Sequence, residues 1–156
     1  MSEHTDQTAI PDLSDDMIKD ARHAIISDYH GKTHPHHISE ALNEFDAYIK
    51  SSAVGGKCVV VGAIIYSKVT LTLYNGHEFS GNGYGFAFPG AGIVFGQLKA
   101  SNLTTLYREA HAFSYHATPV AVIVNFYSAS SVLLGTFIGG GVNVSSGHTA
   151  GSGSWT

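Results

Sequence analysis

Apolar residues recur at helical intervals in two stretches of the first 50 residues. The first predicted helix begins after Ser14, a favourable N-cap residue, and ends before Gly31. Its apolar face comprises Met17, Ile18, Ala21 and Ile25. The second predicted helix covers residues 38–51, and Pro35 breaks the pattern ahead of it. Its apolar face comprises Ile38, Ala41, Leu42, Phe45, Tyr48 and Ile49. Both amphipathic helices need an apolar surface to cover.

The apolar period changes to two from Lys57 onward, which is typical of β-strands. Residues 57–68 and 69–74 are predicted as two strands, and Asn75-Gly76 then gives a strong hairpin signal. A return strand is predicted over residues 77–88. Its large side chains, expected to point into the core, are Tyr84, Phe86 and Phe88. The alternative is that these three form an exposed aromatic platform. Pro89-Gly90 is predicted to turn the chain into the next strand, residues 92–100.

The last third of the chain continues the strand pattern after one short helix, predicted over residues 101–110. Three further strands are predicted at residues 111–118, 120–128 and 131–139, with inward side chains expected at Val122, Val124, Phe126 and Leu134. Seven antiparallel strands would leave exposed edges, so the Gly/Ser-rich end, residues 139–156, is predicted to supply an eighth. Its apolar contacts would come from Val142, Val144 and Trp155. The predicted fold is mainly β: a closed eight-stranded antiparallel β-barrel with one short helix, preceded by two N-terminal amphipathic helices.

Net charge divides the chain near residue 50. Residues 1–50 hold ten acidic and four basic residues, a net charge of −6, whereas residues 51–156 hold two acidic and four basic residues, a net charge of +2. These compositions predict an acidic helical N-terminal region, residues 1–52, and a β-barrel domain, residues 57–156. The small positive charge of the barrel argues against nucleic-acid binding. No apolar run approaches the roughly 20 residues of a membrane-spanning helix, so no transmembrane segment is predicted.

Four stretches of the barrel region carry a family resemblance: "LTLYNG", "GFAFPGAGIVFGQL", "LYREAHAFSYHATPVAVIVNFYSASSVLLGTF" and the terminal "GSGSW". They are motifs of turn, strand and aromatic residues rather than of catalytic groups. On these motifs the chain resembles, over about residues 57–156, the virulence-associated protein (Vap) family first known from the pathogen Rhodococcus equi. The resemblance implies a compact eight-stranded barrel with one short helix. It also implies a secreted factor that acts on the host vacuole and has no established enzymatic role.

The first 50 residues depart from that family pattern, in which a secretory signal and a poorly ordered arm are usual. The opening residues 1–17 are acidic and polar, unlike a signal peptide. We therefore expect export by a signal-independent route if the chain acts as its resemblance implies, and a cytoplasmic location otherwise.

The residues of the barrel region offer no recognisable catalytic set. Glu78 and Glu109 are its only acids and are expected to be solvated. Residues 51–156 contain no aspartate, which excludes a Ser–His–Asp triad within the barrel. The glycine-rich stretch 81–85 fits no phosphate-binding or dinucleotide-binding spacing and indicates bends and close packing. Cys58 lies in an apolar strand and is expected to be a buried, inert thiol. We expect no enzyme activity and no cofactor.

Histidine is the unusual component, with ten residues in the chain. The segment between the two predicted helices concentrates four of them, and the candidates for a weak metal site are His30, His34, His36 and His37. The alternatives for this segment are a solvated loop and a pH-responsive element. Four barrel histidines show no convergence in the sequence, namely His77, His111, His116 and His148.

Two function hypotheses follow. The first is a non-enzymatic, effector-like binding protein that acts at a host membrane or on a host protein, and it rests on the resemblance. The second is a lectin-like or lipocalin-like barrel that binds a small ligand or a carbohydrate, because an eight-stranded barrel can hold one small molecule.

Overall fold

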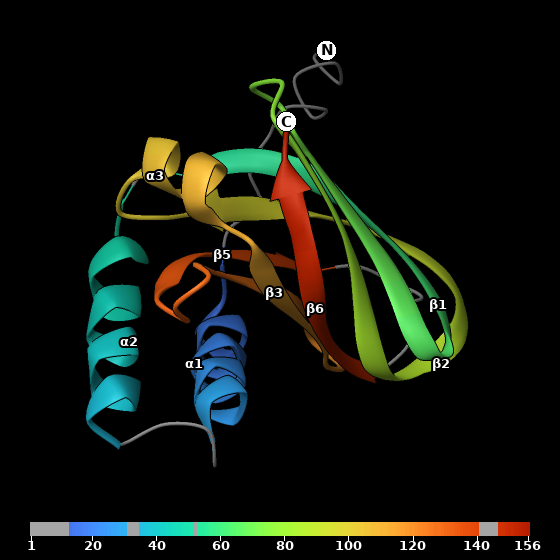
Figure 1. The fold of residues 1–156 in the computed structure, drawn as a ribbon, viewed down its shortest axis with the longest axis horizontal. Coiled ribbons are helices and arrows are strands. Elements are labelled where there is room, and N and C mark those ends of the chain that lie inside the picture. Colours follow the sequence, from blue (N-terminus) through green and yellow to red (C-terminus); the bar gives the residue numbers. More distant parts are fainter. Residues whose placement is uncertain (1–12, 31–34, 52, 141–146) are drawn as a thin grey trace.

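The computed structural model describes residues 13–30, 35–51, 53–140 and 147–156. Figure 1 shows the helices and strands of this described part of the chain. They are α1 (Asp15–Tyr29), α2 (Pro35–Tyr48), β1 (Val54–Leu73), β2 (Glu78–Lys99), α3 (Leu103–Glu109), β3 (Ala112–Ala117), β4 (Val122–Tyr127), β5 (Leu133–Gly140) and β6 (Gly147–Trp155). The predicted third helix and the two N-terminal helices are therefore confirmed.

The strands form a closed antiparallel barrel because different parts of the long strand β2 pair with β5 and with β6. The strand order is β1-β2-β5-β4-β3-β6, with β2 also pairing with β6. Residues 79–87 of β2 pair with β6, whereas its residues 95–99 pair with β5. The barrel class is as predicted, and every pairing between these strands is antiparallel.

The predicted count of eight separate strands is wrong, since the described residues form six continuous ones. Strand β1 joins two of the predicted strands and β2 joins two more, because the chain passes both predicted boundaries without leaving the ladder. The bend in β1 lies where the register shifts between Gly62 and Tyr66. In β2, Gly90 has φ 136, so this glycine bends the strand where a turn was expected. The predicted hairpin after β1 is confirmed by the bond from Leu73 N to His77 O, 2.9 Å.

The Gly/Ser-rich end of the chain closes the barrel, as predicted. Strand β6 lies between β2 and β3 and pairs with both. Trp155 packs against the ring of Phe79, at 5.5 Å between centroids, and against that of Phe126, at 5.4 Å. Val142 and Val144 lie outside the described residues. The glycines of β6 permit this close approach: a Cβ on Gly151 would lie 2.0 Å from the carbonyl oxygen of Asn82.

Deletion of residues 147–156 is expected to convert the protein into an aggregating species. The deletion would uncover the hydrogen-bonding edges of β2 and β3 and remove Trp155 from the core. Size-exclusion chromatography with light scattering measures the outcome, and deletion of Thr156 alone is the matched control. A monomeric, folded deletion variant would contradict the role of β6 in closing the barrel.

The barrel interior is packed with side chains. Its buried rings and branched chains include the predicted inward residues Val122, Val124 and Phe126, and Leu134 packs against the same cluster. Four phenylalanines are fully or almost fully buried there, namely Phe79, Phe113, Phe126 and Phe137. Side chains therefore fill the interior of the barrel, as in other small barrels.

The aromatic face of the first half of β2 points outward, which corrects its predicted burial. Tyr84 and Phe86 are exposed, and the side chain of Phe88 lies outside the described part of the structure. The opposite, inward face carries Gly81 and Gly83, where a Cβ would lie 2.7 Å and 3.2 Å from ring atoms of Phe113. The bulky ring that fills the core at this point comes from β3, so β2 must contribute glycines inward and aromatics outward.

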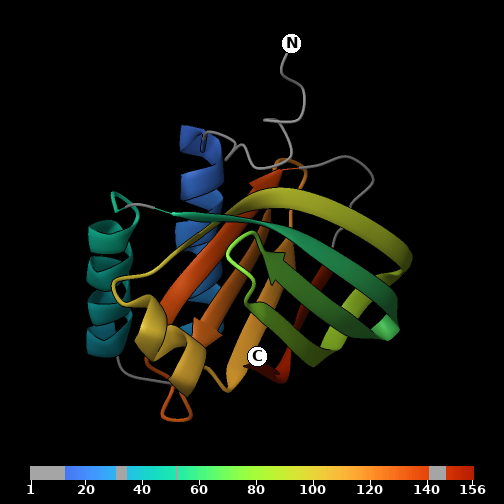
Figure 2. The same cartoon turned by 90° about the horizontal axis from the view of Figure 1, so that it is seen from above.

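Both N-terminal helices lie side by side along one flank of the barrel (Figure 2). The side chain of Ser14 caps α1 by accepting a bond from Met17 N, 3.2 Å. A second apolar cluster joins the helices to the outer side of β4 and β5, and its fully buried members include Ile25, Phe45 and Ile123. None of the helices within the described residues is long and apolar enough to cross a membrane.

The second helix begins at Pro35, three residues earlier than predicted. Proline at the first helical position is favourable because its missing N–H has no intrahelical partner there, so Pro35 starts the helix instead of breaking the pattern. His36 and His37 consequently belong to α2 and not to a loop, which corrects their predicted placement.

Candidate functional site

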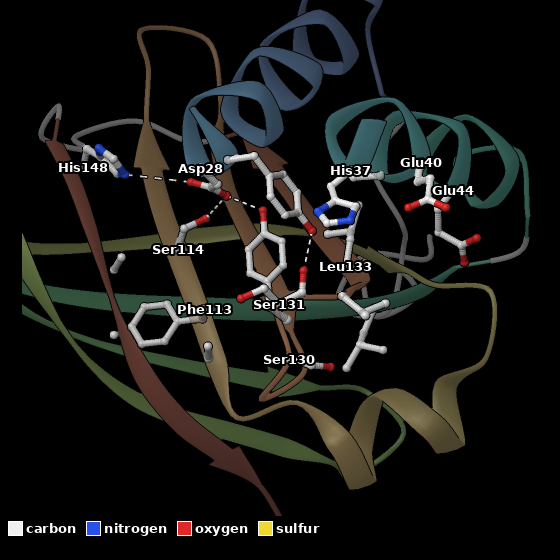
Figure 3. Close-up of a pocket in the computed structure, with 18 of the residues that line it drawn as sticks. Asp28, His37, Glu40, Glu44, Phe113, Ser114, Ser130, Ser131, Leu133 and His148 are labelled. Atoms are coloured by element: carbon white, nitrogen blue, oxygen red, sulfur yellow. Dashed lines mark hydrogen bonds and ion pairs between the residues drawn. The ribbon is translucent and has the colours of Figure 1, made fainter. Parts of the chain in front are cut away.

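Asp28 lies near the end of α1 and points at the outer face of the barrel (Figure 3). Its side chain is only 8% exposed. The Oδ2 atom accepts hydrogen bonds from Ser114 Oγ at 2.5 Å and from Asn125 Nδ2 at 3.1 Å. The hydroxyl of Tyr127 donates a further bond to the same oxygen. Three donors from β3 and β4 therefore fix the orientation of one buried carboxylate.

Two histidines from neighbouring strands meet the other oxygen of this carboxylate. His116 on β3 and His148 on β6 are direct cross-strand partners in the barrel. Their rings stack at 4.2 Å between centroids and 17° between planes. The Nε2 atom of His116 lies 2.7 Å from Asp28 Oδ1, and that of His148 lies 3.9 Å from it.

The charge of Asp28 is stabilised by these partners in spite of its burial. Burial by itself raises the pKa of this carboxyl, but the hydrogen bond and charge of His116, with the bonds from Ser114 and Tyr127, outweigh it, and the net pKa lies below the ordinary value. For Tyr127 the direction is opposite: burial first, and then the neighbouring Asp28 charge, raise its pKa well above the ordinary value. Asp28 is therefore ionised and Tyr127 is a neutral donor at neutral pH.

The network continues from Asp28 to the second helix. Asn125 uses its Oδ1 to accept a bond from Thr136 Oγ1, at 2.8 Å. Thr136 Oγ1 also lies 2.5 Å from the hydroxyl of Tyr48 on α2. A chain of buried polar groups thus connects both helices to β4 and β5, in addition to the apolar cluster described above.

A groove of about 1280 Å³ opens beside Asp28, on the outside of the barrel. Asp28, Glu40 and Glu44 of the helices contribute acidic groups to its lining, and Tyr84 and Phe86 of β2 contribute aromatic rings. A hydrogen bond from Tyr29 OH to Ser131 O, 2.6 Å, fixes the C-terminal end of α1 beside the groove. Strands β3 and β6 also line the groove, and His148 lies on its wall.

The arrangement of Ser114, Asp28 and His116 differs from a nucleophilic triad. In a triad the imidazole lies between the hydroxyl and the carboxylate and accepts the hydroxyl proton. Here the carboxylate lies between the other two groups, and Ser114 donates to Asp28. Asp28 and His116 instead form, with His148, a group of potential metal ligands. One ligand atom from each of these three residues lies within 4.8 Å of the others.

Four histidines were predicted as candidate metal ligands, and the structure describes His30, His37 and the backbone of His36. His30 is the exposed C-cap of α1. His37 is exposed on α2 and lines the groove. His36 lies in α2 but its side chain is outside the described part, as is the whole of His34. A metal site at these four residues stays a prediction.

No pattern in the sequence indicated that His116 and His148 lie beside Asp28. The three residues are far apart along the chain, and only the register of β3 against β6 and the docking of α1 bring them together. The one available signal was the outward strand position of His116 beside Ser114, two residues apart on the same face, in a strand otherwise rich in apolar residues.

Three other predictions about reactive residues are confirmed in their placement. Cys58 is fully buried, and this burial raises the pKa of its thiol to about 12, which disfavours the reactive thiolate. Glu78 and Glu109 are exposed.

The comparisons with known proteins place this fold in one family. Residues 11–156 match the family described as the Rhodococcus equi virulence-associated protein. The match extends further toward the N-terminus than predicted and includes both N-terminal helices. No curated protein matches the chain.

Two solved structures from Rhodococcus equi are similar to the chain. The virulence-associated protein VapB has 31% identity and a TM-score of 0.63, over 67% of this chain and 96% of VapB. The virulence-associated protein VapD has 26% identity and a TM-score of 0.65, over 67% of this chain and 97% of VapD. The chain therefore belongs to the Rhodococcus equi virulence-associated protein family.

Proposed function

We propose that this protein is a secreted, non-enzymatic effector that binds a host membrane surface. The observation that carries the proposal is an exposed apolar surface around the bend of β1 and β2, called the bend patch here. Its members are Val61, Ile64, Ile65, Tyr84, Phe86, Ile93 and Phe95. Exposed patches of this kind mark interaction sites on soluble proteins.

The most exposed side chains of the bend patch are large. Ile65 is 70% exposed, Tyr84 66% and Ile64 60%. Ile64 also has φ 46, a conformation that a β-branched residue rarely adopts, so the backbone is strained where it presents these side chains. Strain of this kind is often retained at functional positions.

The distribution of charge favours a lipid surface as the occupant. The exposed residues Lys57 and Lys68 flank the bend on β1, and Lys57 is the cross-strand partner of Phe95. Seven of the twelve acidic residues lie on α1 and α2, and these helices lie on the flank away from the bend (Figure 1). An apolar surface with adjacent lysines suits an anionic membrane. The side of the bend patch formed by Tyr84 and Phe86 borders the groove that carries the acidic groups, so the membrane would contact the patch from the side of Ile64, Ile65 and the two lysines.

Flotation with lipid vesicles tests the proposal. The protein is expected to float with vesicles that contain phosphatidylserine, and the double variant Ile65→Glu/Tyr84→Glu is expected to lose at least about tenfold in partitioning, because it removes two apolar contacts and adds two repelled charges. Val120→Glu is the matched control, since Val120 is an exposed apolar residue outside the bend patch.

Two results would count against the proposal. The absence of flotation with neutral and anionic vesicles at both pH 7 and pH 5 would contradict membrane binding and leave a host protein as the partner of the bend patch, to be identified by cross-linking. Equal flotation of the double variant and the parent would show that the membrane contact lies outside the bend patch.

A ligand-binding role is the second candidate, and the groove favours it over the barrel interior. The interior is filled by buried side chains, whereas the groove combines two aromatic rings with hydroxyl and amide groups such as those of Ser101, Asn102 and Ser130. Aromatic faces beside polar groups suit a carbohydrate. A glycan array with no ligand would remove this candidate.

A further inference from the structure

We propose that Asp28, His116 and His148 form a zinc-binding site on the wall of the groove. The proposal does not rest on membrane binding, because none of the three residues belongs to the bend patch, although His148 is the cross-strand partner of Phe86 at its border. Two imidazoles and one carboxylate, with a fourth position left for solvent, are a recurrent ligand set for Zn²⁺ in proteins.

The carboxylate is oriented as a metal ligand. Its Oδ2 atom accepts bonds from Ser114, Asn125 and Tyr127, and its Oδ1 atom faces the two imidazoles. Such bonds to the second oxygen fix a ligand carboxylate in position, and their loss typically weakens metal binding about 10–100-fold. The three donor residues therefore orient the Asp28 carboxylate for metal binding and also stabilise the fold.

The distances between donor atoms suit a small ion. Metal–ligand bonds of about 2.0–2.2 Å in tetrahedral geometry separate the ligand atoms by roughly 3.3–3.5 Å. The two Nε2-to-Oδ1 distances, 2.7 Å for His116 and 3.9 Å for His148, lie on either side of that separation. An increase of about 0.6–0.8 Å for His116 and a decrease of about 0.4–0.6 Å for His148 would bring both histidines into place around one ion.

The two histidines contribute differently to the site. His116 is 11% exposed and bonded to Asp28, so its ring is positioned by the barrel. The side chain of His148 is 51% exposed. Its ring stacks on that of His116, so its nitrogen must turn toward the ion. The exposed side also gives an ion a path of entry from the groove.

Binding of the ion changes the protonation of His116. Because Asp28 is ionised and accepts only, His116 must present its Nε2–H to Oδ1 in the metal-free protein. Zn²⁺ needs the lone pair of that nitrogen, so the proton leaves Nε2, either to Nδ1 of the same ring or to solvent. The ion then replaces the proton between nitrogen and carboxylate, with no change in oxidation state.

Isothermal titration of the chelator-treated full-length protein with Zn²⁺ tests the site. One ion per chain is expected, and Co²⁺ is expected to give the visible absorption of a four-coordinate complex. His148→Ala should weaken binding at least about tenfold, because it removes one of the three ligands. The hydrogen bonds of Asp28 to Ser114, Asn125 and Tyr127 do not involve His148, so this variant is expected to stay folded. The matched control is His111→Ala, an exposed histidine outside the site, which should bind within about twofold of the parent.

A further variant separates this site from the other histidine-rich segment. Replacement of His30, His34, His36 and His37 by asparagine should leave the one-to-one binding intact. Tyr127→Phe retains all three ligand atoms but removes one bond to Oδ2, and it should weaken Zn²⁺ binding about tenfold. Circular dichroism establishes that each variant is folded.

Three results would overturn the proposal: a parent protein that binds no stoichiometric Zn²⁺, unchanged affinity in folded His148→Ala, or loss of the binding in the fourfold asparagine variant.

Discussion

Replacing Phe45 with aspartate is expected to destabilise the whole protein by about 3–5 kcal/mol, because the change removes a buried ring and puts a charge in its place. Phe45 is fully buried in the cluster that joins α2 to the barrel and packs edge-to-face on Tyr48, 5.6 Å between centroids. For a protein of this size the loss corresponds to a decrease in Tm of roughly 10 °C or more.

Calorimetry or thermal unfolding followed by circular dichroism measures this effect. Asn43→Asp is the control, since Asn43 is exposed on the same helix. A single transition at lower temperature is the expected result, because the helices and barrel share one cluster and one polar network. A Tm within about 2 °C of the parent would indicate instead that the helix is a detachable arm.

Replacing Asp28 with alanine is expected to cost about 3–5 kcal/mol, the range found when one partner of a buried charged pair is removed. The change leaves Ser114, Asn125, Tyr127 and His116 without their common acceptor. Asp28→Asn should cost less, since its amide oxygen can still accept bonds and its NH₂ can donate to His116. Urea unfolding in the presence of a chelator measures both, with Asp16→Ala on the exposed first turn of α1 as the control.

The contribution of Asp28 should also depend on pH in a defined direction. Its folded pKa lies below the ordinary value of 3.8, so the unfolded chain binds the proton more readily. The stabilisation is therefore present above that ordinary value and is lost as the pH falls toward the folded pKa. The difference in unfolding free energy between the parent and Asp28→Asn should accordingly narrow below about pH 4. A difference that is constant from pH 7 to pH 3 would contradict this account.

Local features of the fold were predictable because they depend on neighbouring residues. The Ser14 cap, the apolar faces of both helices and the Asn75-Gly76 hairpin each follow from a few adjacent positions. Closure by the Gly/Ser-rich end was also predictable, because unpaired strand edges are costly and the residues left over were long enough to cover them.

The outward position of Tyr84 and Phe86 was not predictable from alternation alone. A strand that alternates glycine and aromatic residues fits the core with either face, and sequence preference favours the aromatic one. The ring of Phe113 on β3 already occupies the space that faces Gly81 and Gly83. Only that tertiary contact decides which face is inward, and it produces the exposed aromatic surface on which the proposed membrane role depends.

The amino-acid sequence by itself determined the helices, the hairpin, the closing strand and the barrel class, since these follow from periodicity, turn chemistry and the need to pair edges. The tertiary structure alone decided that β1 and β2 bend without a break, and that Asp28 of α1 meets His116 and His148 of two different strands. The physical reason is that strand register and helix docking are set by packing summed over many distant residues. The candidate site is a product of that register and docking, and no local pattern encodes it.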